Sequence, residues 1–326
     1  MRSIHPVQVS ERWVAFLLAI AVWSLGCDSP NEPKGSGGTP GEDFRSALKG
    51  RLSFESHRDG NLEIYSINAN GTGLQRLTTH GGFDGTPTWS PDGTQIAFVS
   101  DRDGTSGIYV MKADGSSITG PAHSPRTEVY ELAWSPSDSV LAFSTLHNGR
   151  SAIATLDNGG GAVTFLTDGL GWDTQPSWSP DGRHLAFVSS GAFGSDIYTM
   201  NADGTGQRLL TPQLGLGPDL HWYLHPAWSP DGSMIAFVYS SSFVNGADVR
   251  FKVAVMSANG VFLTDLAWAG DLRGWTEDLD PGSLTWSPEG RGIAYTRRGQ
   301  SVRYVSLDGT QEGAIVTGAK SPSWRR

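Results

Sequence analysis

Residues 178–189 read Trp-Ser-Pro-Asp-Gly-Arg-His-Leu-Ala-Phe-Val-Ser, and copies of this stretch recur along the chain. Two further copies are nearly identical, two are weaker, and the chain ends on a shortened copy, Ser-Pro-Ser-Trp. The tryptophans that mark the copies are Trp89, Trp134, Trp178, Trp228, Trp286 and Trp324. A pattern that recurs at a steady spacing indicates a repeat architecture, in which each repeat is one structural unit that packs on its neighbours. The repeats therefore decide the fold.

A second recurring segment places an aromatic residue at the centre of an alternating apolar stretch. Its central residues are Phe54, Phe98, Phe143, Phe187, Phe237 and Tyr295. Apolar residues at every second position are typical of a half-buried strand. Successive tryptophans are 45, 44, 50, 58 and 38 residues apart. These spacings bracket the period of about 40–50 residues that four-stranded propeller blades require.

The two segments together predict an all-β fold, a six-bladed β-propeller of four-stranded antiparallel blades. The first repeat, which starts near residue 50, lacks a tryptophan strand, and the last repeat consists of little else. We therefore expect residues 322–324 to pair beside residues 52–56. The C-terminal strand would then complete the N-terminal partial blade and close the ring.

The residues that the repeats share suit tight turns and stacked sheets. Proline presets φ, aspartate bonds back to the backbone and glycine accepts positive φ, so Pro-Asp-Gly predicts a turn. The tryptophan is large enough to fill the space between neighbouring sheets. Extra residues at 214–224 and 268–280 both precede a tryptophan strand, which places both on one face of the disc. We call it the loop-rich face, and such a face is usually the binding side of a repeat array.

The N-terminal residues are typical of a targeting segment. Arg2 and Arg12 form a basic region, and residues 13–26 are mostly apolar but too few for a good transmembrane span. Residues 1–27 are therefore predicted to be a lipoprotein-type signal peptide. Residues 28–47 are rich in Pro, Gly and Ser, which predicts a flexible tether, and the propeller is expected at 48–326.

Cys27 is the single cysteine of the chain, so no intramolecular disulfide can form. Its place after Ser24-Leu25-Gly26 resembles a bacterial lipobox, in which the cysteine is acylated. That resemblance implies a lipid-anchored protein of the bacterial cell envelope, periplasmic or surface-exposed, whose membrane contact is the lipid on Cys27 only. Lipoboxes usually have leucine where Ser24 stands, which leaves ordinary signal-peptide cleavage as the alternative.

The chain is acidic overall. It carries 24 Lys and Arg residues against 33 Asp and Glu residues, a formal net charge of −9. An acidic surface argues against nucleic acid and anionic lipid headgroups as ligands.

Five successive repeats combine Trp-Ser-Pro-Asp-Gly-x-x-Ile-Ala-Phe with Ser-x-Arg-Asp-Gly, Ile-Tyr-x-Met, Ala-Asp-Gly and Arg-Leu-Thr. Over residues 50–326 these repeats resemble those of the TolB-type β-propeller family. TolB carries an α/β domain before its propeller, and the short segment 28–47 predicts a stand-alone propeller without that domain. The repeats also resemble parts of oligogalacturonate lyase, a metal-dependent propeller enzyme.

The sequence contains no Gly-x-Ser-x-Gly, no His-Glu-x-x-His, no Walker loop and no dinucleotide fingerprint. Asp101 and Asp103 belong to an Asp-x-Asp-Gly turn that could be read as a calcium loop. A calcium loop needs further oxygen ligands at set offsets, which are missing here. A hairpin turn is therefore the favoured interpretation.

Three positions before the tryptophans stand Thr86, Glu131, Gln175, His225, Ser283 and Ser321. These equivalent positions on the innermost strands are expected to line the central channel. Glu131, Gln175 and His225 would then lie on consecutive blades, where a carboxylate, an amide and an imidazole suit a divalent metal or a sugar. His221, four residues before His225, is a further candidate. A solvated channel wall without a ligand is the alternative.

Acidic residues recur five positions before Trp89 and Trp178, at Asp84 and Asp173, and Asp280 lies in the second insertion. An acidic channel mouth built from them would attract a cationic peptide segment or a metal ion. Ordinary solubilising charge is the alternative, and it is the one we favour.

The sequence favours a non-enzymatic module that binds an envelope protein or a glycan through the loop-rich face, without a cofactor. The alternative from another class is a metal-dependent, glycan-active enzyme similar to oligogalacturonate lyase, centred on Glu131, Gln175 and His225. A scaffold that contacts partners only through its rim is a third interpretation.

Overall fold

The computed structural model describes residues 44–122, 128–137, 140–157, 161–191, 194–211, 221–241, 249–272, 283–297 and 300–325. Cys27, the signal segment and residues 28–43 of the tether lie outside the described residues. Within the described part, no helix is long and apolar enough to cross a membrane.

Short strands joined by tight turns make up this part of the chain, preceded by the 3-10 turn η2 (Phe44–Ala47). One sheet has the order β23 (Lys320–Trp324), β1 (Arg51–Ser56), β2 (Glu63–Asn68), β3 (Gln75–Arg76). The second sheet has the order β4 (Asp84–Trp89), β5 (Gln95–Ser100), β6 (Gly107–Lys112). The third sheet consists of β7 (Val129–Trp134), β8 (Val140–His147), β9 (Arg150–Asp157) and β10 (Thr164–Phe165), in that order.

The second half of the chain repeats this plan. Its strands are β11 (Trp172–Trp178), β12 (His184–Gly191), β13 (Gly194–Asn201), β14 (Arg208–Leu209), then β15 (His221–Trp228), β16 (Met234–Ser241), β17 (Val249–Ser257), β18 (Phe262–Leu272), and finally β19 (Leu284–Trp286), β20 (Gly292–Arg297), β21 (Ser301–Ser306), β22 (Glu312–Thr317). The prediction of an all-β fold is confirmed.

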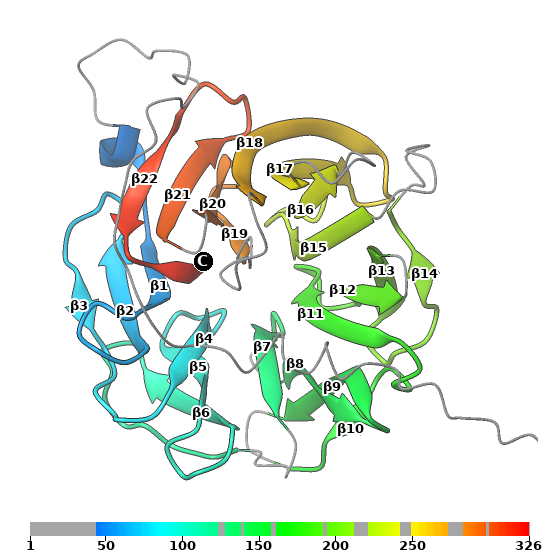
Figure 1. Ribbon diagram of the computed structural model, residues 1–326, viewed down its shortest axis with the longest axis horizontal. Coiled ribbons are helices and arrows are strands. Elements are labelled where there is room, and N and C mark those ends of the chain that lie inside the picture. The colour runs from blue at the N-terminus through cyan, green and yellow to red at the C-terminus, as the bar shows by residue number, and fades with distance from the viewer. Residues whose placement is uncertain are drawn as a thin grey trace, which may run out of the picture.

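Figure 1 shows the sheets arranged around a centre, with β4, β7, β11, β15, β19 and β23 nearest to it. We call these six the inner strands. The described strands form five separate sheets, none of which is closed on itself. Two departures from uniform four-stranded sheets occur. The β4–β5–β6 sheet has three strands and is extended by one isolated bridge, Val110–Thr119.

The other departure is an eight-stranded sheet in which β13 and β15 meet in a short parallel pairing at Gly194–His221 and Ser195–Trp222. The Ser195 hydroxyl explains the close approach, because it donates to the Tyr223 carbonyl at 2.8 Å and accepts from the Tyr223 N–H at 3.1 Å. The β11–β14 strands and the β15–β18 strands are therefore joined through backbone pairing into one sheet.

The C-terminal strand lies where the sequence predicts it. β23 runs antiparallel to β1, with Trp324 opposite Leu52 and Ser323 opposite Ser53. The Trp324 indole N–H donates to the Lys49 carbonyl at 2.9 Å, which ties the end of the chain to the segment just before β1. The two ends of the described chain thus build one sheet.

The core lies between the sheets. The central aromatic residues, which lie in β1, β5, β8, β12, β16 and β20, are at most 1% exposed. The six tryptophans that mark the repeats are 3–8% exposed. Trp178 packs in one cluster with Ala142 and Ile153 of the preceding sheet and with Leu185 and Phe187 of its own. Burying a face of this size between sheets is a main source of stability. The predicted role of the tryptophan as a filler between neighbouring sheets is confirmed.

Each inner strand that ends in Trp-Ser-Pro-Asp-Gly runs into a tight turn, as at residues 179–183. The Asp181 carboxylate accepts from the Ser179 hydroxyl at 2.6 Å and from the Arg183 N–H at 3.0 Å, and these bonds hold its pKa below the usual value. Gly182 has a φ of 69°, which favours glycine. We call these turns the Trp turns. They lie at the C-terminal ends of the inner strands, whereas the connections of the loop-rich face lead into the N-terminal ends.

Candidate functional site

The predicted channel positions coincide with a bulge in the inner strands. In β4, β11, β15 and β23, two residues lie opposite the single central aromatic residue of the neighbouring strand. The first residue of each bulge has left-handed backbone, with φ of 48° at Thr86, 57° at Gln175, 52° at His225 and 54° at Ser321. Such backbone costs a non-glycine residue about 1–2 kcal/mol. Contacts with the surrounding structure must offset this cost, and strained backbone of this kind is frequent at ligand sites.

A proline follows the strained residue at all four bulges, at Pro87, Pro176, Pro226 and Pro322. Proline has no N–H to leave unbonded, so it fits the unpaired second position of a bulge. The sequence analysis did not predict the bulges, although a proline recurs two residues before four of the tryptophans.

Side chains from the preceding sheet satisfy the N–H groups of three bulge residues. Thr86 N–H donates to Glu55 Oε2 at 2.8 Å, and Gln175 N–H donates to Ser144 Oγ at 3.1 Å. Ser321 N–H donates likewise to Thr296 Oγ1 at 3.1 Å. The acceptors Glu55, Ser144 and Thr296 share one place in the repeat, directly after the central aromatic residue.

His225 is the exception, because Val188 occupies the acceptor position of the preceding sheet. Its N–H donates to Gln175 Oε1 at 2.7 Å, while Gln175 Nε2 lies 3.5 Å from His225 Nε2. A Gln175 amide that donates to Nε2 requires a neutral imidazole with its proton on Nδ1. The structure thus brings two of the three predicted metal or sugar ligands, Gln175 and His225, into direct contact. The His225 side chain is 8% exposed.

Glu131 occupies the equivalent bulge of β7, where the register shifts between Tyr130 and Leu132. Burial and the hydrogen bond to Glu128 raise the pKa of the neighbouring Tyr130, and the charge of Glu131 adds a smaller effect in the same direction. No group of three His, Cys, Asp or Glu side chains suited to a metal ion occurs in the described part of the chain. Glu131 thus occupies the same bulge position as Gln175 and His225. A metal site formed by these three residues stays a prediction from the sequence.

Asp84 is fully buried and belongs to the wall between sheets. Its two carboxylate oxygens both accept from Arg102 Nη2 at 2.9 Å. The Arg102 guanidinium lies 5.1 Å from the Phe98 ring centroid and 4.9 Å from that of Tyr109. The Asp84 charge is therefore neutralised inside the protein.

Asp173, the equivalent residue of β11, has no such arginine because Gly191 stands at the matching position. Hydrogen bonds from Ser189 and Thr167 oppose the effect of burial on this carboxyl, but burial dominates and raises its pKa. Its side chain is 5% exposed, beside the more exposed Trp172 at 39%.

The remaining predicted site residues lie at or beyond the edge of the described part. His221 begins β15 and pairs with Ser241 and Gly194, but its side chain is outside the described residues. Asp280 lies outside the described residues, as do most of the two insertions. These positions stay predictions.

The Asp-x-Asp-Gly segment forms a turn, as favoured above. Asp103 accepts from the Tyr109 hydroxyl at 2.5 Å, and Asp101 Oδ1 accepts from the Phe83 N–H at 2.6 Å. Gly104 closes the turn with a φ of 86°. Both carboxylates therefore act within the protein as acceptors for its own groups.

Comparison with protein families gives a match across this whole repeat region. Residues 46–130 and 126–326 match the TolB beta propeller domain, PD40. The chain belongs to this family. The TolB-type resemblance that the repeats indicate is confirmed.

Two curated TolB homologues match part of the chain. The homologue from Chlorobium luteolum is 31% identical over 163 residues, which is 50% of this chain and 36% of the relative. The homologue from Chlorobium chlorochromatii is 35% identical over 146 residues, 45% of this chain and 32% of the relative. The aligned part thus spans about a third of the relatives' length.

Solved structures of low sequence identity share the fold. TolB from Acinetobacter baumannii superposes with a TM-score of 0.67 at 22% identity, over 84% of this chain and 66% of that one. Oligogalacturonate lyase in complex with manganese superposes with a TM-score of 0.55 at 16% identity, over 82% and 74% of the two chains. At these identities the similarity concerns the fold alone.

Proposed function

We propose that this TolB-type chain is a six-bladed propeller that binds an envelope protein segment or a glycan on its loop-rich face, without catalysing a reaction. The six copies of each repeat segment and the pairing of β23 with β1 support the proposed number of six blades.

The observation that carries the proposal is the contact between Gln175 and His225. Two adjacent inner strands hold an amide and an imidazole together on strained backbone, 3.5 Å apart at Nε2. The same strand, β11, begins with Trp172, which is 39% exposed beside Leu170 at 74%. Exposed apolar groups beside fixed polar groups are typical of a recognition surface.

Photo-crosslinking tests this proposal. A benzophenone amino acid at Trp172 should give one dominant conjugate with an envelope extract of the source bacterium. The conjugate should disappear in a Gln175→Ala, His225→Ala double variant and in competition with the purified partner. The matched control places the same amino acid at Leu74, which is 49% exposed near the other ends of the strands. Equal labelling from both positions, or labelling that survives the double variant, would contradict the proposal.

We further propose a location at the bacterial envelope through a lipid on Cys27. Wild-type protein expressed in a bacterium should fractionate with membranes, and Cys27→Ser should fractionate with soluble proteins. Mass spectrometry of the mature N-terminal peptide should show an acylated cysteine. An unmodified N-terminal peptide would support ordinary signal-peptide cleavage in its place.

The second candidate is a metal-dependent, glycan-active enzyme, and the observation that favours it is again the Gln175–His225 contact. An imidazole and an amide oxygen suit a transition metal, and oligogalacturonate lyase, a fold neighbour, was solved with manganese. Stoichiometric metal together with cleavage of an acidic polysaccharide, both lost in His225→Ala, would favour this candidate.

A further inference from the structure

Two repeats hold an arginine over an aromatic ring pair of their own sheet. Arg58 and Arg102 both stand four residues after a central aromatic residue, in hairpins at the loop-rich face. Each guanidinium lies 4.9 Å from the centroid of a tyrosine ring, and each Nε donates at 3.0 Å to the serine two residues before it. The tyrosines and serines beneath the two arginines are at most 2% exposed: Tyr65, Tyr109, Ser56 and Ser100. An arginine therefore covers this place in both repeats.

The repeat that contains β11 to β14 keeps the groups that surround such an arginine. Asp173 lies opposite Ser189, in the same register as the aspartate and the serine that bind Arg102. The ring centroids of Phe187 and Tyr198 are 5.8 Å apart and the ring planes are inclined by 31°, the same values as for the ring pair beneath Arg102. The carboxylate, the hydroxyl and the two rings are thus all present in matching positions.

Only the arginine is missing from this set. Gly191 stands at its position, and a Cβ on Gly191 would meet no atom within 4 Å. Ser189 and Tyr198 are partly exposed, whereas their counterparts beneath an arginine are buried. The carboxylate of Asp173 accepts from hydroxyl groups of Ser189 and Thr167, and within the described part of the chain no basic side chain pairs with it. The groups that would hold a guanidinium therefore lack one from this chain.

We propose that Asp173, Phe187, Ser189 and Tyr198 bind the guanidinium of an arginine on the envelope protein segment that the loop-rich face recognises. The guanidinium lies over the ring pair, donates to the Ser189 hydroxyl and pairs with Asp173, as Arg102 does in its own repeat. A planar guanidinium can make these contacts at once, whereas the compact ammonium of a lysine cannot. The identity of the partner rests on the function proposed above, but the binding of a guanidinium does not.

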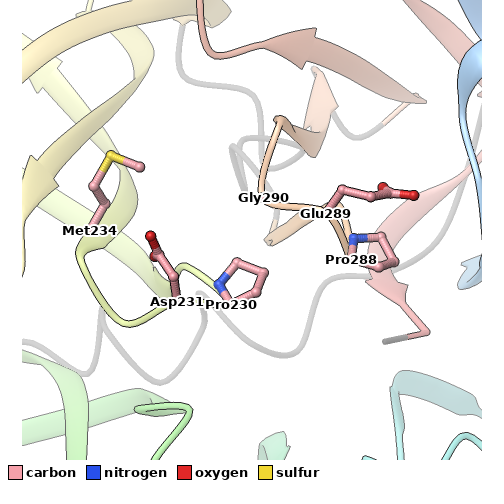
Figure 2. Close-up of a pocket in the computed structure, with 6 residues that line it drawn as sticks. All are labelled: Pro230, Asp231, Met234, Pro288, Glu289 and Gly290. Carbon is pink, nitrogen blue, oxygen red and sulfur yellow. The ribbon is translucent and has the colours of Figure 1, made fainter.

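Another acidic location serves as the comparison, at the opposite ends of the inner strands. Asp231 and Glu289 border a pocket of about 270 Å³ between two Trp turns (Figure 2). Both residues are exposed, and no aromatic ring is among the residues that line the pocket. Without a ring pair and a buried carboxylate, this pocket should not bind a guanidinium.

NMR titration of the full-length protein with two peptides tests the proposal. The first peptide is acetyl-Gly-Gly-Arg-Gly-Gly-amide, and its control carries neutral citrulline in place of arginine. The arginine peptide should shift the amide signals of Ser189, Gly191 and Tyr198, and the citrulline peptide should not. Equal responses to the two peptides, or shifts centred on the pocket of Figure 2, would overturn the proposal because general attraction to an acidic surface would then explain the binding.

Substitutions at Gly191 give the sharpest variants. Gly191→Arg supplies the missing guanidinium from the protein itself, so it should abolish binding of the arginine peptide. Gly191→Ala is the matched control, since it leaves the site open and should bind as the wild type does. Asp173→Asn should weaken binding by about tenfold or more, because it removes a charged acceptor, and Glu289→Gln should leave binding unchanged. Unchanged binding in Gly191→Arg, or an equal loss in Gly191→Ala or Glu289→Gln, would overturn the proposal.

The crosslinking experiment described above separates this inference from the proposed function. Its benzophenone amino acid replaces Trp172, next to Asp173, and the conjugate should be lost in Gly191→Arg. A conjugate that forms equally in Gly191→Arg would overturn the inference and leave the proposed function standing. Specific binding of the arginine peptide without any conjugate from position 172 would support the guanidinium site and contradict the proposed function alone.

Discussion

At the residue scale, the residue after each central aromatic residue determines which group accepts a hydrogen bond from the strained N–H of the next inner strand. Glu55, Ser144 and Thr296 accept the N–H of a strained residue, whereas Val188 cannot. Gln175 replaces the missing acceptor by bonding to the His225 N–H. The Gln175–His225 contact thus follows from one apolar substitution in the repeat.

The strain at the bulges leads to a prediction for Thr86, a β-branched residue with a φ of 48°. Thr86→Gly should be close to neutral, because relief of about 1–2 kcal/mol offsets the entropic cost of glycine. The control is Thr88→Gly in the same strand, where no strain is relieved, so it should destabilise by about 1 kcal/mol. Urea denaturation measures both. Equal destabilisation by the two variants would contradict the strain argument.

The pKa shifts predict opposite pH profiles for two aspartates. Burial raises the pKa of Asp173 above 3.8, so its ionisation lowers the free energy of unfolding as pH rises through the raised pKa. Asp173→Asn, which keeps an oxygen acceptor for Ser189 and Thr167, should therefore gain stability relative to wild type as pH rises.

Asp308 is the control, because its pKa is lowered to about 2, chiefly by a hydrogen bond from Ser306. Its contribution to stability is present above 3.8 and lost as pH falls towards 2. Asp308→Asn should thus be less stable than wild type at neutral pH and equal to it near pH 2. Thermal unfolding between pH 2 and 8 measures both profiles, and parallel profiles would refute the assignment.

At the element scale, the Ser-x-Arg-Asp-Gly hairpins lock neighbouring strands. Arg58 and Arg102 both stack on a Phe–Tyr pair, but they differ in their partners. Arg102 neutralises the buried Asp84, while Arg58 donates to the Thr317 carbonyl at 3.0 Å. The same motif therefore has a larger energetic role where it faces a buried charge.

Methionine substitution separates these roles, since it keeps a flexible apolar side chain over the rings. Arg102→Met should destabilise by about 3–5 kcal/mol because it leaves Asp84 buried without a counter-charge. Arg58→Met should cost about 1 kcal/mol, the value of a cation–π contact and an exposed hydrogen bond. Chemical denaturation at neutral pH measures the difference, and a similar cost for both would contradict it.

At the scale of the whole molecule, the first and last strands build one sheet. Trp324 contributes to the core shared by β1 and β21 and is 3% exposed. Trp324→Ala should therefore destabilise by about 3–5 kcal/mol. Trp172→Ala should cost below about 1 kcal/mol, because its side chain is 39% exposed. Loss of stability that is equal in the two variants would argue against a structural role for the terminal strand.

Much of this architecture is predictable because each repeat carries its own turn and strand signals. The pairing of residues 322–324 with β1 followed from two partial repeats, and the buried tryptophans followed from residue size alone. The strained bulges were not predicted, because the residue before a proline ordinarily has extended backbone. Only the packed sheets show that these positions are left-handed.

The candidate site was predictable in position but not in detail. Equivalent spacing before the tryptophans placed Gln175 and His225 on neighbouring strands, and the structure brings them together. The buried charge of Asp84 is neutralised by Arg102, which lies beyond the next strand in the repeat. Asp173 lacks such a partner because Gly191 stands where the arginine would be, and burial raises its pKa. Such pairings require the register of three strands, which spacing alone does not fix.

The most direct test of the account is the metal content of untagged protein covering residues 48–326, measured by elemental analysis beside His225→Ala. A binding module in which Gln175 serves as the partner of His225 should hold no stoichiometric metal in either protein. One transition metal per chain in the wild type, absent from the variant, would contradict the account and favour the enzyme.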